Sequence, residues 1–230
     1  MFELEEKPKS IASEAYRSIR TNIQYSSLDN EIRSMVVTST EPGEGKTITV
    51  CNLAFAFAQS EKKTIIIDCD LRKSSIHKEF KLSNLIGLSD VLVGNKELDE
   101  AVNNYSENLS ILTAGKISPN PSEMLDSKAM ELLLGITKSK YDVIIIDSPP
   151  LQLVTDAQIL STKVDGVILV VKAGSTKRKS LLQAKDLLNK VRGNILGVIL
   201  NKVENKKDKY YYYYSDDEEN KNEAKNNKDQ

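Results

Sequence analysis

The stretch "STEPGEGKTITV", residues 39–50, decides the fold. A β-branched run, "MVVTST", leads into its glycines, and the apolar stretch "TITVCNLAFAFAQS" that overlaps its end suits a buried helix. A glycine-rich turn between a strand and a helix, ending in Gly-Lys-Thr, is typical of loops that bind nucleotide phosphates. The stretch therefore predicts a P-loop, with these ATP-binding residues: Gly43, Glu44, Gly45, Lys46, Thr47 and Ile48.

Each residue type in this loop has a chemical reason to be there. Gly43 and Gly45 let the backbone approach phosphate closely with its N–H groups pointing inward. Lys46 is expected to reach the β- and γ-phosphates, and the Thr47 hydroxyl to bind Mg²⁺. The full pattern has glycine five residues before the second loop glycine, where this chain has Thr40. This departure affects the outer rim of the loop.

Three acidic residues end two apolar runs farther along the chain. Asp68 and Asp70 follow "TIII" in "IIIDCDLR", and Asp147 ends "YDVIIID". If these strands run parallel to the first, all three carboxylates emerge at the edge where the P-loop lies. Mg²⁺ keeps several waters and takes few direct carboxylates, so Thr47, Asp70 and Asp147 are the predicted metal residues. An alternative is that the acids cap the helices that follow.

The remaining pattern alternates apolar strands with helices. Continuous apolar strands between helices predict an α/β fold with a mostly parallel central sheet covered on both faces. We expect one domain over residues 1–203, and a flexible tyrosine-rich tail at 204–230 that is too polar to form a core. The strands are expected at 35–40, 64–68, 108–114, 141–147, 165–173 and 195–203, and the helices at 10–25, 47–60, 121–137 and 175–193.

Composition excludes several classes of protein. The 230 residues have a formal net charge of −1, whereas a dedicated nucleic-acid binder usually has a strong basic excess. No apolar run approaches the roughly 18 residues that a membrane span needs, and the charged start has no signal-peptide core. Cys51 and Cys69 lie in apolar patterns, so we expect free thiols in a reducing cytosol and no zinc or iron–sulfur site.

The tail contains a run of five consecutive tyrosines with almost no aliphatic residues near them: Tyr210, Tyr211, Tyr212, Tyr213 and Tyr214. Without a P-loop, an adhesive tail or a segment that adds to a sheet edge would be the favoured interpretation. With a P-loop in the same chain, all five tyrosines are better interpreted as phosphoacceptors. Asp68 is then the candidate base for the phenol proton, and Lys46, Asp68 and Asp70 are the predicted catalytic residues.

These motifs together resemble the bacterial tyrosine kinases (BY-kinases) of the capsule-synthesis CapB/CpsD type. "GEGKT" is similar to their Walker A motif, "IIIDCDLR" to Walker A′ and "IIIDSPP" to Walker B. "EAYRSIR" places Glu14, Arg17 and Arg20 in their E-x-x-R-x-x-R oligomerisation motif. Taken without the resemblance, these three residues could form a solvated helix face with one i,i+3 ion pair.

The resemblance implies a MinD-like P-loop NTPase fold that uses ATP and Mg²⁺. It implies phosphorylation of the five tail tyrosines between subunits of a ring, an octamer in the family. It also implies activation by the cytoplasmic C-terminal segment of a transmembrane adaptor, at the inner face of the cell membrane. The process controlled would be capsular or exopolysaccharide synthesis and export, with other protein substrates and no nucleic acid.

Two alternatives stay open at this point. One is a MinD/ParA-like ATPase switch, although Glu41 stands where that branch has a lysine. The other is a non-catalytic, nucleotide-gated scaffold. Among lesser candidates, Asn201 would contact adenine by the resemblance to related P-loop ATPases. Arg72 could contact phosphate, a partner or a surface carboxylate, and the basic stretch 175–180 could meet an acidic surface or be a solvated turn.

Overall fold

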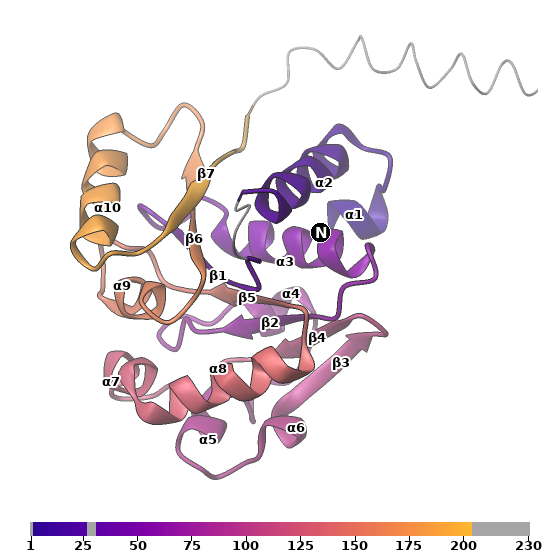
Figure 1. Cartoon of the computed structure of the whole chain (residues 1–230), viewed down its shortest axis with the longest axis vertical. Helices are drawn as coiled ribbons and strands as arrows, with labels where there is room; N and C mark the ends of the chain where they lie inside the picture. Colours follow the sequence, from indigo (N-terminus) through magenta and orange to yellow (C-terminus); the bar gives the residue numbers. More distant parts are fainter. Residues whose placement is uncertain (1, 27–30, 204–230) are drawn as a thin grey trace, which may run out of the picture.

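The computed structural model of the protein describes residues 2–26 and 31–203. They form a seven-stranded sheet with the order β3-β4-β2-β5-β1-β6-β7, and helices flank both faces (Figure 1). The strands are β1 Ser34–Ser39, β2 Thr64–Asp68, β3 Val102–Ser106, β4 Leu109–Leu112, β5 Val143–Asp147, β6 Gly166–Lys172 and β7 Ile195–Asn201.

The sheet is mostly parallel, which confirms the predicted fold class. The pairs β1–β5, β1–β6, β2–β4, β2–β5 and β6–β7 are parallel, and only β3 pairs antiparallel, with β4, among the described strands. Asp68 at the end of β2 is the register partner of Asp147 at the end of β5, and β5 in turn lies beside β1. The strand that leads into the P-loop and both strands that end in acids therefore finish at one edge.

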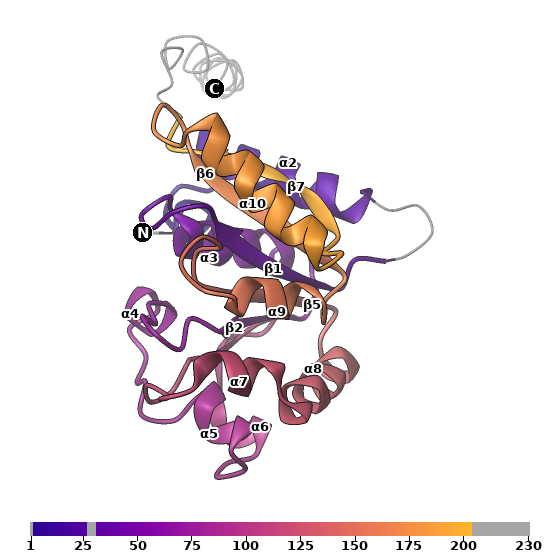
Figure 2. The ribbon, with the colours of Figure 1, turned by 90° about the vertical axis from the view of Figure 1, so that its left-hand side faces the viewer.

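Helices cover the sheet in two layers because side chains alternate along each strand. Met35 and Val37 of β1 pack in a core with α1 to α4, whereas Val36 packs on the opposite face with α5 to α9. A smaller cluster joins α9 and α10 to β6, and Figure 2 shows α10 lying alongside β6 and β7. The helices are α1 Glu3–Glu6, α2 Ile11–Gln24, α3 Lys46–Ala58, α4 Ile76–Glu79, α5 Leu88–Leu92, α6 Leu98–Ala101, α7 Pro121–Asp126, α8 Lys128–Lys140, α9 Asp156–Ser161 and α10 Arg178–Lys190.

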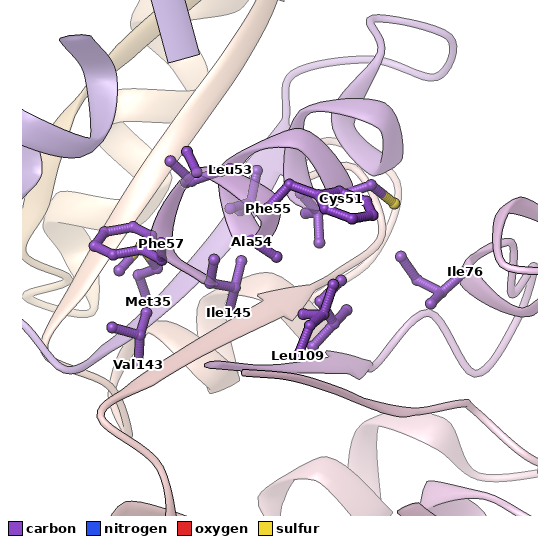
Figure 3. Close-up of a cluster of buried hydrophobic side chains, with 14 of the residues drawn as sticks. Met35, Cys51, Leu53, Ala54, Phe55, Phe57, Ile76, Leu109, Val143 and Ile145 are labelled. Atoms are coloured by element: carbon purple, nitrogen blue, oxygen red, sulfur yellow. The ribbon is translucent and has the colours of Figure 1, made fainter. Parts of the chain in front are cut away.

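Helix α3, which begins at the P-loop lysine, is the most deeply buried of the long helices. Leu53, Phe55 and Phe57 of α3 belong to one buried core cluster, and Phe57 lies beside Met35 of β1 in Figure 3. Helix α2 covers α3 on its outer side, as Figure 1 shows. The start of α3 is therefore held rigidly at the sheet edge.

The prediction of a single helix over residues 121–137 is wrong, because the structure has two helices there, α7 and α8. Ser127 separates them with an extended backbone, at φ −69° and ψ 158°. Its side chain accepts a hydrogen bond from the Met130 N–H at 3.2 Å and donates one to the Met124 carbonyl at 2.7 Å. A serine that satisfies both helix ends stabilises this break.

Among the described residues, no helix is long and apolar enough to cross a bilayer.

Candidate active site

The phosphate loop connects β1 to α3 and adopts a conformation that only glycine accommodates easily. Gly43 has φ 78° and Gly45 has φ 93°, both in the left-handed region. A Cβ atom on Gly45 would also lie 2.0 Å from the Asn201 Nδ2 atom. No side chain caps the start of α3, so the first N–H groups of this helix remain available for an anion.

Lys46 and Thr47 both bind the carboxylate of Asp147. The Lys46 ammonium forms an ion pair with Asp147 Oδ1, and the Thr47 hydroxyl donates to Oδ2 at 2.8 Å. Burial raises the pKa of Asp147, while the charge and hydrogen bond of Lys46 and the bond from Thr47 lower it. The Thr47 hydroxyl also lies 2.9 Å from Ser75 Oγ. The loop thus reaches both acidic strand ends, directly at β5 and through Ser75 after β2.

Asp68 lies buried beside this pair. It accepts hydrogen bonds from the N–H groups of Asp70, Ser75 and Ile76 at 3.1, 3.2 and 3.1 Å. Burial and then the nearby Asp147 charge raise the pKa of Asp68 to about 7, against the opposing effect of Lys46. A carboxylate with a pKa near 7 is suited to accept a proton at neutral pH. The alternative capping role is also realised here, since Ser75 and Ile76 begin α4.

Asp70 is 7% exposed, and its Oδ1 accepts the Lys73 N–H at 2.9 Å. The structure therefore brings Asp68, Asp70 and Asp147 to the edge where Lys46 lies. No group of three acidic, histidine or cysteine side chains forms a closed metal cage in the described part of the chain. A threonine hydroxyl and two carboxylates are hard oxygen donors, which fit a magnesium ion that keeps most of its waters.

The departure at Thr40 is explained by Glu44, whose buried carboxylate ties the loop together. It accepts hydrogen bonds from the Thr40 N–H at 2.8 Å, the Thr40 hydroxyl at 2.9 Å and the Glu41 N–H at 2.9 Å. Thr176, on the turn between β6 and α10, donates a further hydrogen bond. A side chain at position 40 thus helps to shape the loop, and we call this set of bonds the Glu44 clasp.

Comparisons with known proteins agree with this geometry. A family described as an AAA domain matches residues 32–205. The tyrosine-protein kinase YwqD of Bacillus subtilis is 44% identical over 85% of this chain and 83% of its own. The putative tyrosine-protein kinase CapB of Staphylococcus aureus is 40% identical over 86% of this chain and 87% of its own.

This chain belongs to the bacterial tyrosine kinases. The crystal structure of the chimerical protein CapA2B2 superposes on the kinase with a TM-score of 0.86 at 38% identity, covering 89% of this chain and 90% of the chimera. The kinase domain of Escherichia coli ETK gives 0.85 at 32% identity over 91% of this chain and 83% of that domain. A plasmid partition protein from Borrelia burgdorferi, at 20% identity and a TM-score of 0.60, shares the fold.

Two residues at the end of β7 lie against the phosphate loop of the kinase. The Asn201 amide donates to the Glu44 carbonyl at 3.0 Å, and Lys202 Nζ donates to the Gly43 carbonyl at 3.1 Å. The resemblance to related P-loop ATPases predicts adenine contact for Asn201, whereas no motif in the sequence marks Lys202. Ile48, in the first turn of α3, is partly exposed.

Arg72, for which the sequence allows a phosphate, a partner or a surface carboxylate as the contact, pairs with a buried carboxylate. Its guanidinium donates to both oxygens of Asp156, at 3.0 and 3.1 Å, and to Ser122 Oγ at 2.9 Å. Ser122 in turn donates to Asp156 at 2.6 Å. Asp156 was not identified, because nothing in its local sequence distinguishes it from other helix-start acids.

The E-x-x-R-x-x-R residues of α2 divide into two environments. Glu14 and Arg17 form an ion pair at the surface. Arg20 instead donates from Nη1 to the Ala56 carbonyl of α3 at 3.1 Å, and its buried Nε has no partner in the described structure. Arg20 therefore also fastens α2 to α3.

The predicted phosphoacceptors are the site residues that do not fall within the described ranges 2–26 and 31–203. The residues that lie outside the described structure are Tyr210, Tyr211, Tyr212, Tyr213 and Tyr214. Their role as acceptors, and the flexible tail predicted over 204–230, therefore stay predictions from the sequence.

Proposed function

We propose that this kinase transfers the γ-phosphoryl group of ATP to Tyr210–Tyr214 on the tail of another subunit. The observation that carries the proposal is the meeting of three motifs at one sheet edge. Lys46 and Thr47 share the carboxylate of Asp147, and Asp68 lies beside Asp147 in register. A triphosphate on the loop would then lie next to a carboxylate whose pKa of about 7 fits a general base.

The chemical step is a direct displacement at phosphorus. A tyrosine phenol, with a pKa of about 10 in model compounds, is a weak nucleophile at neutral pH. Asp68 accepts its proton as the phenolic oxygen bonds to the γ-phosphorus, and the bond to the bridging oxygen breaks to release ADP. Lys46 and the loop N–H groups hold the phosphate oxygens, so positioning and charge neutralisation supply most of the rate enhancement.

Thr47, Asp70 and Asp147 are the residues that would hold magnesium. When bound, the ion neutralises charge on the phosphate oxygens. Asp147 lies within hydrogen-bond reach of both Lys46 and Thr47. It is therefore placed to orient the lysine and the threonine toward the same phosphates.

The names of similar proteins support a proposal for the cellular role of this chain. YwqD, CapB and CpsD are named as tyrosine kinases, and CapA2B2 joins a CapA segment to a CapB one by its name. We propose that this chain forms a ring of the family's octameric kind, in which Glu14, Arg17 and Arg20 take part. We further propose that the cytoplasmic C-terminal segment of a membrane adaptor recruits and activates it, and that it regulates capsular or exopolysaccharide synthesis and export.

A complementation assay tests the phosphotransfer. The acceptor is a full-length chain with Lys46→Met and Asp147→Asn, which removes the buried ion pair as a whole. The donor is a full-length chain with Tyr210–Tyr214 changed to phenylalanine. With ATP, magnesium and the adaptor's cytoplasmic segment, we expect phosphotyrosine on the acceptor tail, located by mass spectrometry.

Two outcomes would reject the proposal. ATP hydrolysis without phosphotyrosine would select a MinD/ParA-like ATPase switch. Neither activity, with nucleotide still bound, would select a nucleotide-gated scaffold. A donor with Asp68→Asn provides the matched control, because it keeps the shape of the side chain and removes only the proton acceptor. We expect it to bind nucleotide and to lose phosphotransfer.

A further inference from the structure

The start of α10 lies directly against the outer side of the phosphate loop. Thr176, in the turn before α10, donates to the Glu44 carboxylate, and Ser180, in the first turn of α10, donates from Oγ to Glu41 Oε1 at 2.9 Å. These two hydrogen bonds show that Thr176 and Ser180 both face the loop. The three residues between them, 177–179, are exposed beside it.

These three residues are all basic, and a fourth cation joins them. Lys177, Arg178 and Lys179 are exposed, as is Lys202, whose Nζ contacts the Gly43 carbonyl of the loop. We call these four residues the basic rim. Among the described residues, none of the four forms an ion pair with a carboxylate. The rim therefore presents uncompensated positive charge next to the place where phosphate is transferred.

The tail has a matching and asymmetric charge pattern. Three lysines and one aspartate, in residues 206–209, precede the tyrosines, and the continuous acidic run Asp216–Glu219 follows them. An extended chain spans about 3.3 Å per residue, so an acceptor tyrosine on the loop brings the acidic run to within about 7–20 Å of it. A triphosphate repels four carboxylates over such distances, which are comparable to the Debye length of about 8 Å. Nearby cations would remove this obstacle.

We propose that the basic rim binds the acidic run Asp216–Glu219 of the tail that is being phosphorylated. This inference rests on the proposed function and specifies its substrate as tyrosine followed by acidic residues. The rim attracts the acidic side of the cluster and repels the lysines on its other side, so it fixes the direction in which the tail crosses the site. Asp216 lies thirteen positions after Val203, an extended reach of about 43 Å, so the tail of a second copy can reach the rim.

The test compares rim and tail in one assay. Donor chains, with their own five tail tyrosines changed to phenylalanine, have either the natural rim or Lys177→Gln, Arg178→Gln and Lys179→Gln. Acceptor chains have either the natural acidic run or Asp216→Asn, Asp217→Asn, Glu218→Gln and Glu219→Gln. A matched control donor loses three exposed lysines elsewhere, through Lys128→Gln, Lys185→Gln and Lys190→Gln.

At saturating ATP, we expect the rim substitutions to lower kcat/KM for the natural tail about tenfold, the size expected for the loss of three exposed ion pairs. The loss should come through KM and shrink as salt is added. With the neutralised tail, the rim substitutions should change the rate less than about twofold, because no ion pairs remain to be lost.

An equal loss with both tails would overturn the proposal and place the effect in nucleotide binding. No loss beyond that of the control donor would overturn it as well. Phosphatidylserine vesicles that bind the natural rim, combined with rates independent of the acidic run, would assign the rim to a lipid surface. If even the unmodified pair gives no phosphotyrosine, the proposed function has failed, and this result is distinct from a loss confined to the rim variants.

Discussion

Replacing Thr40 with valine should weaken ATP binding while leaving the fold intact. The Thr40 hydroxyl lies 2.9 Å from both carboxylate oxygens of Glu44, and both residues are buried. Valine keeps the shape of threonine and removes only this donor. A hydrogen bond to a charged group contributes about 1.5–3 kcal/mol, so the loop should lose that much of its preference for the clasped conformation.

The loss of this hydrogen bond should lower the affinity for ATP rather than unfold the domain, because a loop opens locally at a lower free-energy cost than global unfolding. If the opened loop does not bind triphosphate, the Kd for ATP rises in inverse proportion to the clasped fraction, and 1.5–3 kcal/mol corresponds to an increase of at most about 10- to 150-fold. A fluorescent ATP analogue measures the Kd, and urea unfolding measures the global stability of the same samples.

Two control variants isolate the hydroxyl. Thr40→Ser keeps the donor and should bind ATP nearly as the natural chain does. Thr38→Val removes another buried threonine hydroxyl, which donates to the Pro149 carbonyl at 2.9 Å, and should leave the Kd unchanged. An unchanged Kd in Thr40→Val, or an equal loss in Thr40→Ser, would refute the role assigned to the Glu44 clasp.

Other features of the site give three further predictions. Lys46→Met leaves Asp147 buried without its cation and should lower the free energy of unfolding by about 3–5 kcal/mol. Adding Asp147→Asn to this variant should restore most of the lost stability. Equal stabilities of the single and double variants in urea would contradict the prediction. Ionising Asp68, whose pKa is raised to about 7, opposes folding, so stability in metal-free buffer should fall from pH 5 to 7 and level off above 7. The slope should be at most about 1.4 kcal/mol per pH unit and absent in Asp68→Asn; parallel pH curves for the two chains would reject it. Burial raises the pKa of Cys51 and Cys69, so a disulfide reagent should label them only on unfolding, and rapid labelling of the native chain would count against this.

The sequence predicted those parts of the fold that local pattern determines. The apolar runs gave β2 at 64–68 as observed and β5 within a residue or two. β3 was missed because "VNNYS" is short and polar, and it forms a strand through its pairing with β4. The break between α7 and α8 was detectable, since Ser127 three residues before Met130 is a possible helix cap inside the apolar pattern.

For the site, parallel strands that end at one edge were enough to predict that Lys46 and Asp147 lie close together. The Glu44 clasp was beyond prediction from the sequence, because Thr176, one of its donors, is 132 positions away along the chain. Motif comparison marked Thr40 only as a departure. The structure gives Thr40 a role, because its hydroxyl donates a hydrogen bond to the Glu44 carboxylate.

Because Lys46 and Asp147 form an ion pair, Lys46 must exchange this carboxylate for the phosphates when ATP binds. Each group already neutralises the other, so a triphosphate that draws Lys46 away leaves Asp147 as a lone anion in a buried position. A divalent cation arriving with the triphosphate supplies a replacement at the same moment. ATP and magnesium should therefore assist each other's binding, and a triphosphate stripped of its cation should be a poor competitor.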